Sequence, residues 1–305
     1  MKYDVTVIGA GPGGYVAAIR CAQLGFKTAL IEKHSALGGT CLNVGCIPSK
    51  ALLDSSEHYH NANKHFKTHG IEVSNLSVNL KQMIERKNGV VKKTTDGIDY
   101  LMKKNEVDVF HGFGKFKDKN TIVIEGEEIK EIQTDKTIIA TGSEPASLPF
   151  ISLDGERVIT STEALDITDL PKSMVVIGGG IIGCELGSVY ARLGTQVTII
   201  EYLPRIVPGM DPDIAKDLLR SLKKLGIKFQ LGTQVTEVTN QGSTVNIKAK
   251  GKKDAELSFD AEYCLVSVGR KPYTENLALD KIGLATDDRG RIPVNEKLMT
   301  EVDGI

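Results

Sequence analysis

The residue types best suited to redox chemistry lie in residues 38–50, which read GGTCLNVGCIPSK. Cys41 and Cys46 lie five residues apart there, between a glycine pair and Lys50. A cysteine thiolate can attack a disulfide sulfur or donate electrons to an acceptor. We therefore interpret the two cysteines as a redox disulfide. Two buried thiols that never bond are the alternative.

A regular helix or strand would keep the two sulfur atoms apart. Residues i and i+5 lie more than ~7 Å apart in a straight helix and ~16 Å apart in a strand, too far for a disulfide. The chain must therefore bend between Cys41 and Cys46. Gly45 supplies the backbone freedom for this bend, and Pro48, which has no N–H, suits the first turn of a helix.

A dinucleotide-binding fingerprint precedes the cysteine motif. An apolar run at residues 4–9 leads into Gly-Ala-Gly-Pro-Gly-Gly, and an amphipathic helix and a second strand ending at Glu32 follow. Gly9 makes the tight turn, Gly11 lets the backbone approach a pyrophosphate, and Gly14 allows close packing of helix on strand. Glu32 is placed to accept a hydrogen bond from a ribose hydroxyl.

The same pattern recurs in the second half of the sequence. Gly178, Gly180 and Gly183 repeat the glycine spacing, and Glu201 ends the next strand. The first glycine and the acid are 23 residues apart in both copies. The sequence therefore predicts an α/β fold with two Rossmann-like dinucleotide-binding domains.

The acid at the end of the second copy indicates which nucleotide binds there. Glu201 favours the free 2′-hydroxyl of NAD and would repel the 2′-phosphate of NADP. Arg205, the nearest basic residue, lies four positions on, beyond Pro204. We therefore expect NAD at the second site. The cysteine pair follows the first site directly, so we expect that site to bind FAD, which can exchange electrons with sulfur.

Two strands that end in glycine indicate how the domains are connected. Residues 137–145, TIIATGSEP, and 264–272, CLVSVGRKP, bracket the second fingerprint, so we expect the NAD domain to be inserted into the FAD domain. The expected domains are an FAD-binding domain with the redox disulfide at 1–146, an NAD-binding domain at 147–269 and a truncated return segment at 270–305.

Other elements can be assigned from hydrophobic periodicity. Residues 52–66 predict a polar helix whose histidines lack the cysteines or acids that would complete a metal site, and 80–104 predict a longer amphipathic helix. Asp211 and Pro212 mark the start of a helix. Its predicted buried stripe is Ile214, Leu218, Leu219 and Leu222. Residues 228–238 and 245–251 predict antiparallel strands.

Two isolated features have alternative interpretations. Cys184 follows the second glycine loop, where a helix N-terminus could make it reactive, but we expect a packed core residue, as for Cys21 and Cys264. Gly114 could let the backbone approach a ligand, or it could form a plain turn.

Composition excludes several other classes of protein. The 305 residues, 41% hydrophobic and 25% charged, suit about two globular domains. A formal net charge of -1 gives no electrostatic footprint for nucleic acid, and no segment approaches the ~20 apolar residues of a membrane span. No signal peptide is visible, and five irregularly spaced cysteines do not form a secreted disulfide framework, so we expect a cytoplasmic location.

These motifs together resemble the class I pyridine nucleotide-disulfide oxidoreductases. GGTCLNVGCIPSKALL, both fingerprints, TIIATGSEP and SVGRKP carry the resemblance, which covers essentially the whole sequence. The cysteine motif is more similar to that of the members that oxidise dihydrolipoyl groups than to that of glutathione or mercuric reductases. The resemblance implies an FAD-dependent, NAD-linked enzyme. Electrons would pass from a dihydrolipoyl group to the Cys41–Cys46 disulfide, then to FAD, and then as hydride to NAD.

The resemblance also implies roles for individual residues. Cys41 matches the thiol that attacks substrate sulfur, and Cys46 matches the thiol that faces the flavin. Lys50 matches a lysine beside the flavin that pairs with a glutamate, here Glu185, and its charge would stabilise a thiolate. These four are the expected catalytic residues. The expected cofactor-binding residues are Gly9, Gly11, Gly14, Glu32, Lys33, Gly39, Thr40, Lys50, Gly114, Thr141, Gly142, Ser143, Gly178, Gly180, Ile182, Gly183, Glu201, Val235, Gly269 and Arg270.

The resemblance stops short of the family's C-terminal part. That part carries an Ala-x-Gly-Asp segment that contacts the flavin, the dimerisation domain and a His-Glu pair. We therefore expect an incomplete enzyme, whose complete form is a homodimer that serves the dihydrolipoyl groups of 2-oxo acid dehydrogenase complexes and binds neither nucleic acid nor membrane. Another flavin disulfide reductase, similar to glutathione or mercuric reductase, and a non-catalytic nucleotide-binding fragment stay open as alternatives.

Overall fold

The computed structural model describes all residues, 1–305, and divides into two compact units. Unit 1 comprises Met1–Cys46, Val91–Glu144 and Arg270–Ile305, and unit 2 comprises Ile47–Val90 and Pro145–Gly269. The second of these units thus includes residues 47–90, which the sequence assigns to the first domain. The division into units does not show which nucleotide each unit binds, so the assignment of FAD and NAD to the domains stays a prediction.

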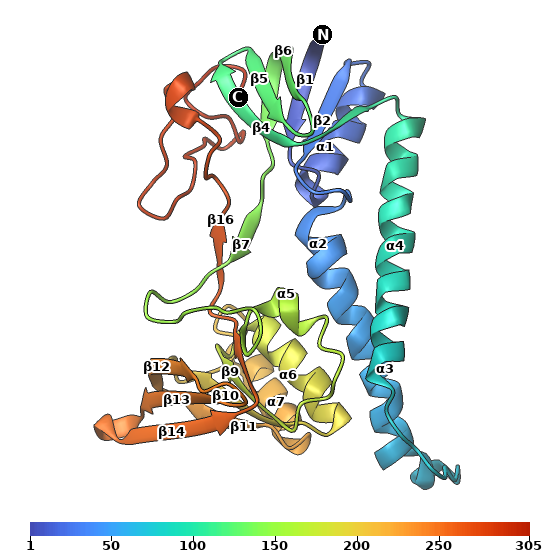
Figure 1. Cartoon of the computed structure of the whole chain (residues 1–305), viewed down its shortest axis with the longest axis vertical. Helices are drawn as coiled ribbons and strands as arrows, with labels where there is room; N and C mark the ends of the chain where they lie inside the picture. The colour runs from blue at the N-terminus through green and yellow to red at the C-terminus, as the bar shows by residue number, and fades with distance from the viewer. The chain divides into compact units, whose positions relative to one another are not determined.

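Unit 1 is built on a six-stranded sheet in the order β3-β2-β1-β6-β5-β4 (Figure 1). Its strands are β1 (Lys2–Ile8), β2 (Thr28–Glu32), β3 (Asp108–His111), β4 (Phe113–Asp118), β5 (Thr121–Glu125) and β6 (Ile129–Ile139). β1 pairs in parallel with β2 and β6, whereas β5 pairs antiparallel with β4 and β6. Helix α1 (Pro12–Gln23) connects β1 to β2 and packs on both strands. This is the crossover that the first fingerprint predicts.

The C-terminal segment contributes to the core of unit 1. Leu277 and Ile305 are buried in one hydrophobic cluster with Tyr3, Ile31 and Phe116 from the sheet. The segment includes the strand β16 (Arg270–Pro272) and the 3₁₀ helix η3 (Leu279–Ile282). Residues 270–305 are therefore an integral part of this unit.

Unit 2 contains a second, entirely parallel sheet in the order β11-β10-β9-β15-β8. Its strands are β8 (Val158–Ile159), β9 (Ser173–Ile177), β10 (Gln196–Glu201), β11 (Lys228–Leu231) and β15 (Tyr263–Val266). Helix α6 (Ile181–Leu193) connects β9 to β10, and α7 (Pro212–Lys224) connects β10 to β11. The expectation of an antiparallel strand at β11 is wrong, because α7 returns the chain for a parallel crossover. The predicted α/β fold with two Rossmann-like units is confirmed.

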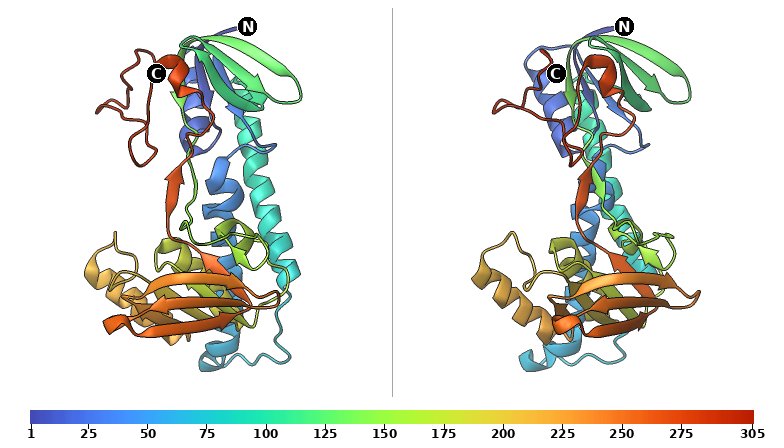
Figure 2. Two further views of the ribbon diagram at one scale, coloured as in Figure 1. Left: turned by 60° about the vertical axis from the view of Figure 1, so that its left-hand side comes forward. Right: turned by 90° about the vertical axis from the view of Figure 1, so that its left-hand side faces the viewer.

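A separate antiparallel sheet covers part of unit 2. It consists of β12 (Gln234–Asn240), β13 (Val245–Lys250) and β14 (Glu256–Ala261), which lie side by side in both views of Figure 2. Val245 and Ile247 from this sheet share a buried cluster with Val175 and Ile177 of β9. One hydrophobic cluster of unit 2 therefore lies between its two sheets.

Two long helices carry the polar segment between the fingerprints. Helix α4 (Leu80–Lys104) has the predicted bounds. Helix α3 (Cys46–Lys64) begins six residues before the predicted start at 52, because Pro48 is accommodated in its first turn. None of the helices is both long enough and apolar enough to cross a bilayer. The remaining short elements are α2 (Gly39–Val44), α5 (Ser161–Ala164), β7 (Ser143–Pro145) and the 3₁₀ helices η1 (Phe66–His69) and η2 (Lys252–Asp254).

The predicted buried stripe of α7 is wrong at Ile214. This side chain is 58% exposed, whereas Ala215 and Leu222 are buried. The stripe therefore starts one residue later, because buried positions on a helix repeat at intervals of three or four. The predicted start of α7 is confirmed, since the Asp211 carboxylate accepts a hydrogen bond from the N–H of Asp213 at 2.9 Å.

Two adjacent threonines in the core of unit 1 leave their hydroxyls without a partner. Thr6 in β1 and Thr137 in β6 are register partners and are 0% and 3% exposed. Neither hydroxyl oxygen has a hydrogen-bond partner. A buried polar group in this state costs free energy that an apolar group of similar shape would not.

Substitution Thr6→Val is therefore expected to raise the free energy of unfolding by about 1 kcal/mol, measured by urea denaturation. Thr28→Val is the matched control, because the buried Thr28 hydroxyl donates to the Phe26 carbonyl at 2.9 Å. The Thr28→Val substitution should lower the free energy of unfolding by about 1 kcal/mol. Equal destabilisation by both substitutions would contradict the conclusion that the Thr6 hydroxyl has no hydrogen-bond partner.

Candidate active site

The first glycine loop is a turn that only glycine can make. Gly9 has φ +101°, and a Cβ atom there would lie 2.4 Å from the carbonyl oxygen of Ala140 on the neighbouring strand. A Cβ atom on Gly14 would lie 1.7 Å from the carbonyl oxygen of Gly9. The turn thus brings β1, α1 and the end of β6 into direct backbone contact.

The second glycine loop repeats this geometry in unit 2. Gly178 has φ +108°, and a Cβ atom there would lie 2.4 Å from the carbonyl oxygen of Ser267, just beyond β15. A Cβ atom on Gly183 would lie 2.2 Å from the carbonyl oxygen of Gly178. Both fingerprints therefore form the same strand-to-helix turn.

The helices that follow the two loops leave their first N–H groups uncapped. Gly11 and Gly180 occupy the N-cap positions of α1 and α6, and neither helix start has a side-chain cap. By contrast, Thr160 caps α5 and Asp211 caps α7. Uncapped N–H groups beside a glycine turn are suited to bind the pyrophosphate of a dinucleotide. The backbone at both loops therefore fits the two expected nucleotides.

Each predicted ribose-binding acid is buried and held by backbone N–H groups. Glu32 is 5% exposed and accepts from the N–H of Ala10 at 2.8 Å and from the N–H of His34 at 2.9 Å. Glu201 is 9% exposed and accepts from the N–H of Gly179 at 2.6 Å and from the N–H of Leu203 at 2.7 Å. A carboxylate has about four acceptor sites, so each acid keeps capacity for ribose hydroxyls.

The cysteine motif contains the bend that the sequence predicts. Cys41 lies in α2, Cys46 begins α3, and Gly45 separates the two helices with φ −142° and ψ −115°. A Cβ atom on Gly45 would lie 2.7 Å from the carbonyl oxygen of Thr40 and 3.3 Å from the Cα atom of Cys41. The backbone is therefore tightly packed around the glycine that separates the two helices.

The cysteine motif also contacts the first glycine loop. Gly39 has φ +58°, and a Cβ atom there would lie 2.4 Å from the Cα atom of Gly11. The N–H of Gly38 donates to the carbonyl of Ala10 at 2.9 Å. Two of the expected cofactor-binding residues, Gly11 and Gly39, are thus brought together. Cys41 follows two positions after this contact.

Arg270 joins three of the segments expected to bind the cofactor in unit 1. Its Nε donates to Ser143 Oγ at 2.8 Å, and one terminal nitrogen reaches Thr40 Oγ1 at 3.4 Å. Burial lowers the pKa of the guanidinium, and the negative charges of Glu144 and Cys46 oppose that shift. The guanidinium is therefore a positive charge on the cysteine side of unit 1.

Tyr273 is a residue at this site that the sequence analysis missed. Its carbonyl accepts from Thr141 Oγ1 at 2.5 Å, and its N–H donates to Gly142 at 3.0 Å. The ammonium of Lys33 lies 3.6 Å from the centre of its ring, a cation–π contact. Tyr273 thus connects three expected cofactor-binding residues. Its position directly after GRKP was the available signal.

Lys50 and Glu185 form an ion pair in unit 2. The Nζ atom of Lys50 donates to both carboxylate oxygens of Glu185, at 2.8 and 2.9 Å. The Lys50 side chain is 56% exposed and the Glu185 side chain 26% exposed. The structure therefore pairs the two residues that the resemblance pairs. Their catalytic roles stay predictions.

The remaining expected cofactor-binding residues differ in how accessible they are to a ligand. Val235 is buried in the core of unit 2, so only its backbone could reach a nucleotide. Ile182 is half-buried in α6, and Gly269 has φ +124°. The interpretation of Gly114 as a plain turn is wrong, because this residue lies inside β4 against the side chains of Ile31 and Ile8.

Burial raises the pKa of each of the three isolated cysteines, Cys21, Cys184 and Cys264. Burial raises the pKa of Cys184 to about 12, and the charges of Glu201 and Glu185 add to the shift. Cys264 is also buried, with a pKa raised to about 12, again mainly by burial. Cys21 is only half-buried, so its assignment to the core is wrong. No group of three or more His, Cys, Asp or Glu side chains could hold a metal ion.

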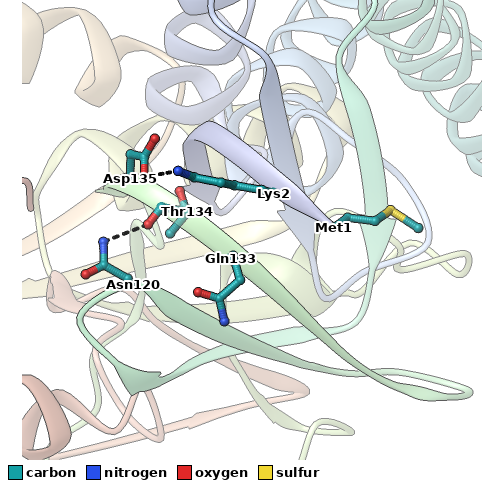
Figure 3. A pocket seen from close by; sticks show the side chains of 6 residues that line it. All are labelled: Met1, Lys2, Asn120, Gln133, Thr134 and Asp135. Carbon is teal, nitrogen blue, oxygen red and sulfur yellow. Dashed lines mark hydrogen bonds and ion pairs between the residues drawn. The ribbon is translucent and has the colours of Figure 1, made fainter.

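One surface depression lies away from these residues, at the start of β1 (Figure 3). Its lining residues are Met1, Lys2, Asn120, Gln133, Thr134 and Asp135. Lys2 and Asp135 form an ion pair across it at 3.0 Å. Ligands of parallel sheets bind at the carboxyl ends of the strands, so this depression is at the wrong end for a nucleotide.

The fold and these loops together define a protein with two dinucleotide-binding units and a cysteine motif beside the first. Residues 3–305 match the family described as pyridine nucleotide-disulphide oxidoreductase. The chain belongs to this family, which confirms the resemblance found in the sequence. The family uses FAD and NAD, the two cofactors that the sequence predicts.

Curated relatives are identical to this chain at about half of the matched positions. Mitochondrial dihydrolipoyl dehydrogenase of Pisum sativum is 49% identical, over 99% of this chain and 61% of its own length. The mitochondrial enzyme of that name from Homo sapiens is 48% identical, over 99% of this chain and 60% of its own length. The chain therefore spans about three-fifths of the length of these relatives.

A solved structure has a similar fold. The copper(II) complex of the HOCl-induced flavoprotein disulfide reductase RclA from Escherichia coli matches with a TM-score of 0.85 and 28% sequence identity. The match covers 100% of this chain and 65% of that chain.

Substitution Gly45→Ala is expected to disrupt the cysteine motif and to lower the free energy of unfolding by about 2 kcal/mol. The added methyl group would overlap the Thr40 carbonyl oxygen, which is a backbone atom and cannot rotate away. Urea denaturation measures the loss. Gly89→Ala in α4 is the control, because no atom lies within 4 Å of its added Cβ. An unchanged Gly45→Ala protein would show that the bend is looser than described.

Cys184 is expected to resist alkylation in the folded protein at pH 8. With a pKa of about 12, only about one thiol in ten thousand is ionised at that pH. Reduced protein should incorporate iodoacetamide at the exposed Cys46 within minutes, while Cys184 reacts only after unfolding in urea. Peptide mass spectrometry distinguishes the two sites. Rapid labelling of Cys184 in the native state would refute its burial as a neutral thiol.

Proposed function

We propose that this chain is the nucleotide-binding and disulfide part of a dihydrolipoyl dehydrogenase. The observation that carries this proposal is the bent cysteine motif, which lies against the first glycine loop through Gly39 and Gly11. A dithiol or disulfide held beside a dinucleotide loop is suited to exchange electrons with a flavin. The curated relatives at 48–49% identity support the dihydrolipoyl group as the substrate.

The chemistry is a thiol–disulfide exchange followed by transfer of two electrons. A thiolate of the dihydrolipoyl group attacks the Cys41 sulfur, and the bond from Cys41 to Cys46 breaks. The second substrate sulfur then displaces Cys41, which leaves an oxidised lipoyl ring and two reduced cysteines. The first glycine loop, with Gly9, Gly11 and Gly14, would hold FAD, which would supply a two-electron acceptor for the reduced cysteines, and NAD at the second loop would be the final acceptor of a hydride. Each dihydrolipoyl group thus yields one NADH and one proton.

Positively charged residues would assist by stabilising the cysteine thiolates. Lys50 lies four residues after Cys46 on α3, so both project from nearly the same side of that helix. Glu185 holds the Lys50 ammonium in one position. Arg270 supplies a second positive charge, close enough to Cys46 to interact with it electrostatically. A thiolate is the form of cysteine that donates electrons.

The second site is proposed to bind NAD in preference to NADP. The Glu201 carboxylate is fixed at the end of β10, where it would repel a 2′-phosphate. The guanidinium of Arg205, the one nearby cation that could offset this, donates to the carbonyl of Pro208 at 2.7 Å. Arg205 is thus held within its own loop.

We further propose that the complete protein is a homodimer that oxidises dihydrolipoyl groups of 2-oxo acid dehydrogenase complexes. The relatives named dihydrolipoyl dehydrogenase support this partner. Neither nucleic acid nor membrane is among the proposed partners. We propose a cytoplasmic location because the cysteine spacing does not suit a disulfide framework, although several relatives are named mitochondrial. Cell fractionation separates these two locations.

Comparing substrates for NADH oxidation tests the proposed activity on the complete protein. Lipoamide, glutathione disulfide and mercuric ion are offered separately at equal concentration. We expect lipoamide to be reduced fastest. Faster reduction of either of the other two would transfer the assignment to another disulfide reductase, and no flavin binding at all would favour a non-catalytic fragment.

Separate roles are expected for the two cysteines. The Cys46→Ser variant, loaded with FAD and partly reduced, should lack the long-wavelength absorbance of a thiolate beside a flavin. The Cys41→Ser variant should keep it, because Cys46 can then no longer form a disulfide with residue 41. If both variants kept the absorbance, the assignment of the cysteines would be wrong.

A further inference from the structure

Helices α3 and α6 of unit 2 are joined by a second ion pair besides that of Lys50 and Glu185. One terminal nitrogen of Arg192 lies 2.6 Å from Glu57 Oε2. Glu57 is on α3, like Lys50, and Arg192 is on α6, like Glu185. The same two helices are therefore connected at two levels.

The two ion pairs have the same spacing along both helices. Glu57 lies seven residues after Lys50, and Arg192 lies seven residues after Glu185. Seven residues make about two helical turns, or ~10 Å, so the two charged residues on each helix lie on the same side of that helix. Two parallel helices can form both ion pairs only in one register.

The signs of the charges are reversed between the two levels. The cation of the first pair is on α3, whereas the cation of the second pair is on α6. A shift of α3 by two turns would oppose Glu57 to Glu185, and an antiparallel arrangement would oppose Lys50 to Arg192. Both alternatives bring like charges together. The charge pattern therefore selects the observed register and direction.

The cation of the second ion pair is less exposed than that of the first. The Arg192 side chain is 19% exposed, and its Nε atom is buried without a hydrogen-bond partner. The guanidinium therefore depends on Glu57 for compensation of its charge. The other acid on this part of α3, Asp54, pairs instead with Arg86 of α4 at 2.7 Å.

We propose that Glu57 and Arg192 are positioning residues that hold Lys50 against Glu185. Because each helix is rigid over two turns, the register fixed at Glu57 and Arg192 also fixes the distance between the Lys50 ammonium and the Glu185 carboxylate. The two residues touch neither the cysteines nor any expected nucleotide contact. Their importance for catalysis rests on the proposed function of Lys50, but the geometric coupling does not.

The reactivity of the Lys50 amine measures this coupling directly. Acetylation of the intact chain by a small amount of acetic anhydride, with peptide mass spectrometry, gives a rate for each lysine. An ammonium held by a carboxylate reacts slowly, so Glu57→Gln should raise the Lys50 rate about threefold. Glu185→Gln should raise it by a similar factor. Adding Glu57→Gln to Glu185→Gln should then have little further effect, because the pair is already broken.

Matched variants separate positioning from a general loss of stability. Glu237→Gln removes an exposed ion pair with Lys248 in the same unit, and it should leave the Lys50 rate unchanged. The charge swap Glu57→Arg with Arg192→Glu restores an attractive pair and should return the Lys50 rate to that of the parent chain. Lys117, paired with Glu131 in unit 1, serves as the internal reference.

An unchanged Lys50 rate in Glu57→Gln, with a lower free energy of unfolding, would overturn the proposal and leave the second pair a purely structural contact. A raised rate that the charge swap fails to restore would also overturn it. The proposed function is tested separately by Lys50→Met in FAD-loaded, partly reduced protein. If that variant kept the full thiolate–flavin absorbance, the proposed catalytic role of Lys50 would be wrong. The coupling between the two ion pairs would be unaffected by that result.

Discussion

The structure depends on the close approach of backbone to backbone at the two strand-to-helix turns. At Gly9 and Gly178 the chain turns with positive φ so near to the adjacent strand exit that a Cβ atom would lie 2.4 Å from a carbonyl oxygen in each case. This contact directs an uncapped helix N-terminus toward the carboxyl end of the sheet. It also places Glu32 and Glu201 within hydrogen-bonding distance of the loop that they stabilise.

The two units share this turn and differ in what is attached to it. In unit 1 the cysteine motif packs on the glycine loop through Gly39, so the position of the cysteines depends on the conformation of that loop. In unit 2 the helix that follows the loop carries Glu185 and Arg192, which bind charged residues of α3. Cys46 is the first residue of α3. Two charged residues of α3, Lys50 and Glu57, are thus paired with side chains that follow the second fingerprint.

Local rules made much of this arrangement predictable from the sequence. The glycine spacing predicted both turns, α4 has its predicted bounds, and the bend at Gly45 follows from the distance that two sulfur atoms can span. The pairing of Lys50 with Glu185 came only from the family resemblance, because the two residues are 135 positions apart. No local pattern contains such information.

The features that the sequence analysis missed all depend on tertiary contacts. Lys87 lies on the inner stripe of α4 and is 3% exposed, because its ammonium binds the Leu165 carbonyl at 3.0 Å and Asp166 at 2.5 Å. A charged residue on a buried stripe can be recognised only when its partner is known. Ile214 was misplaced for the opposite reason, since an apolar residue beside the stripe resembles one within it. Tyr273 is defined by its contacts with Thr141 and Lys33, which come from distant parts of the sequence.

We propose that the cysteine pair and the two nucleotides form one path for two electrons. Anaerobic titration of FAD-loaded protein from either end of that path tests it most directly. One equivalent of dihydrolipoamide and, separately, one equivalent of NADH should each produce the same spectrum and the same two additional titratable thiols. If NADH changed the flavin spectrum without releasing thiols, or dihydrolipoamide released thiols without changing that spectrum, the account would be contradicted.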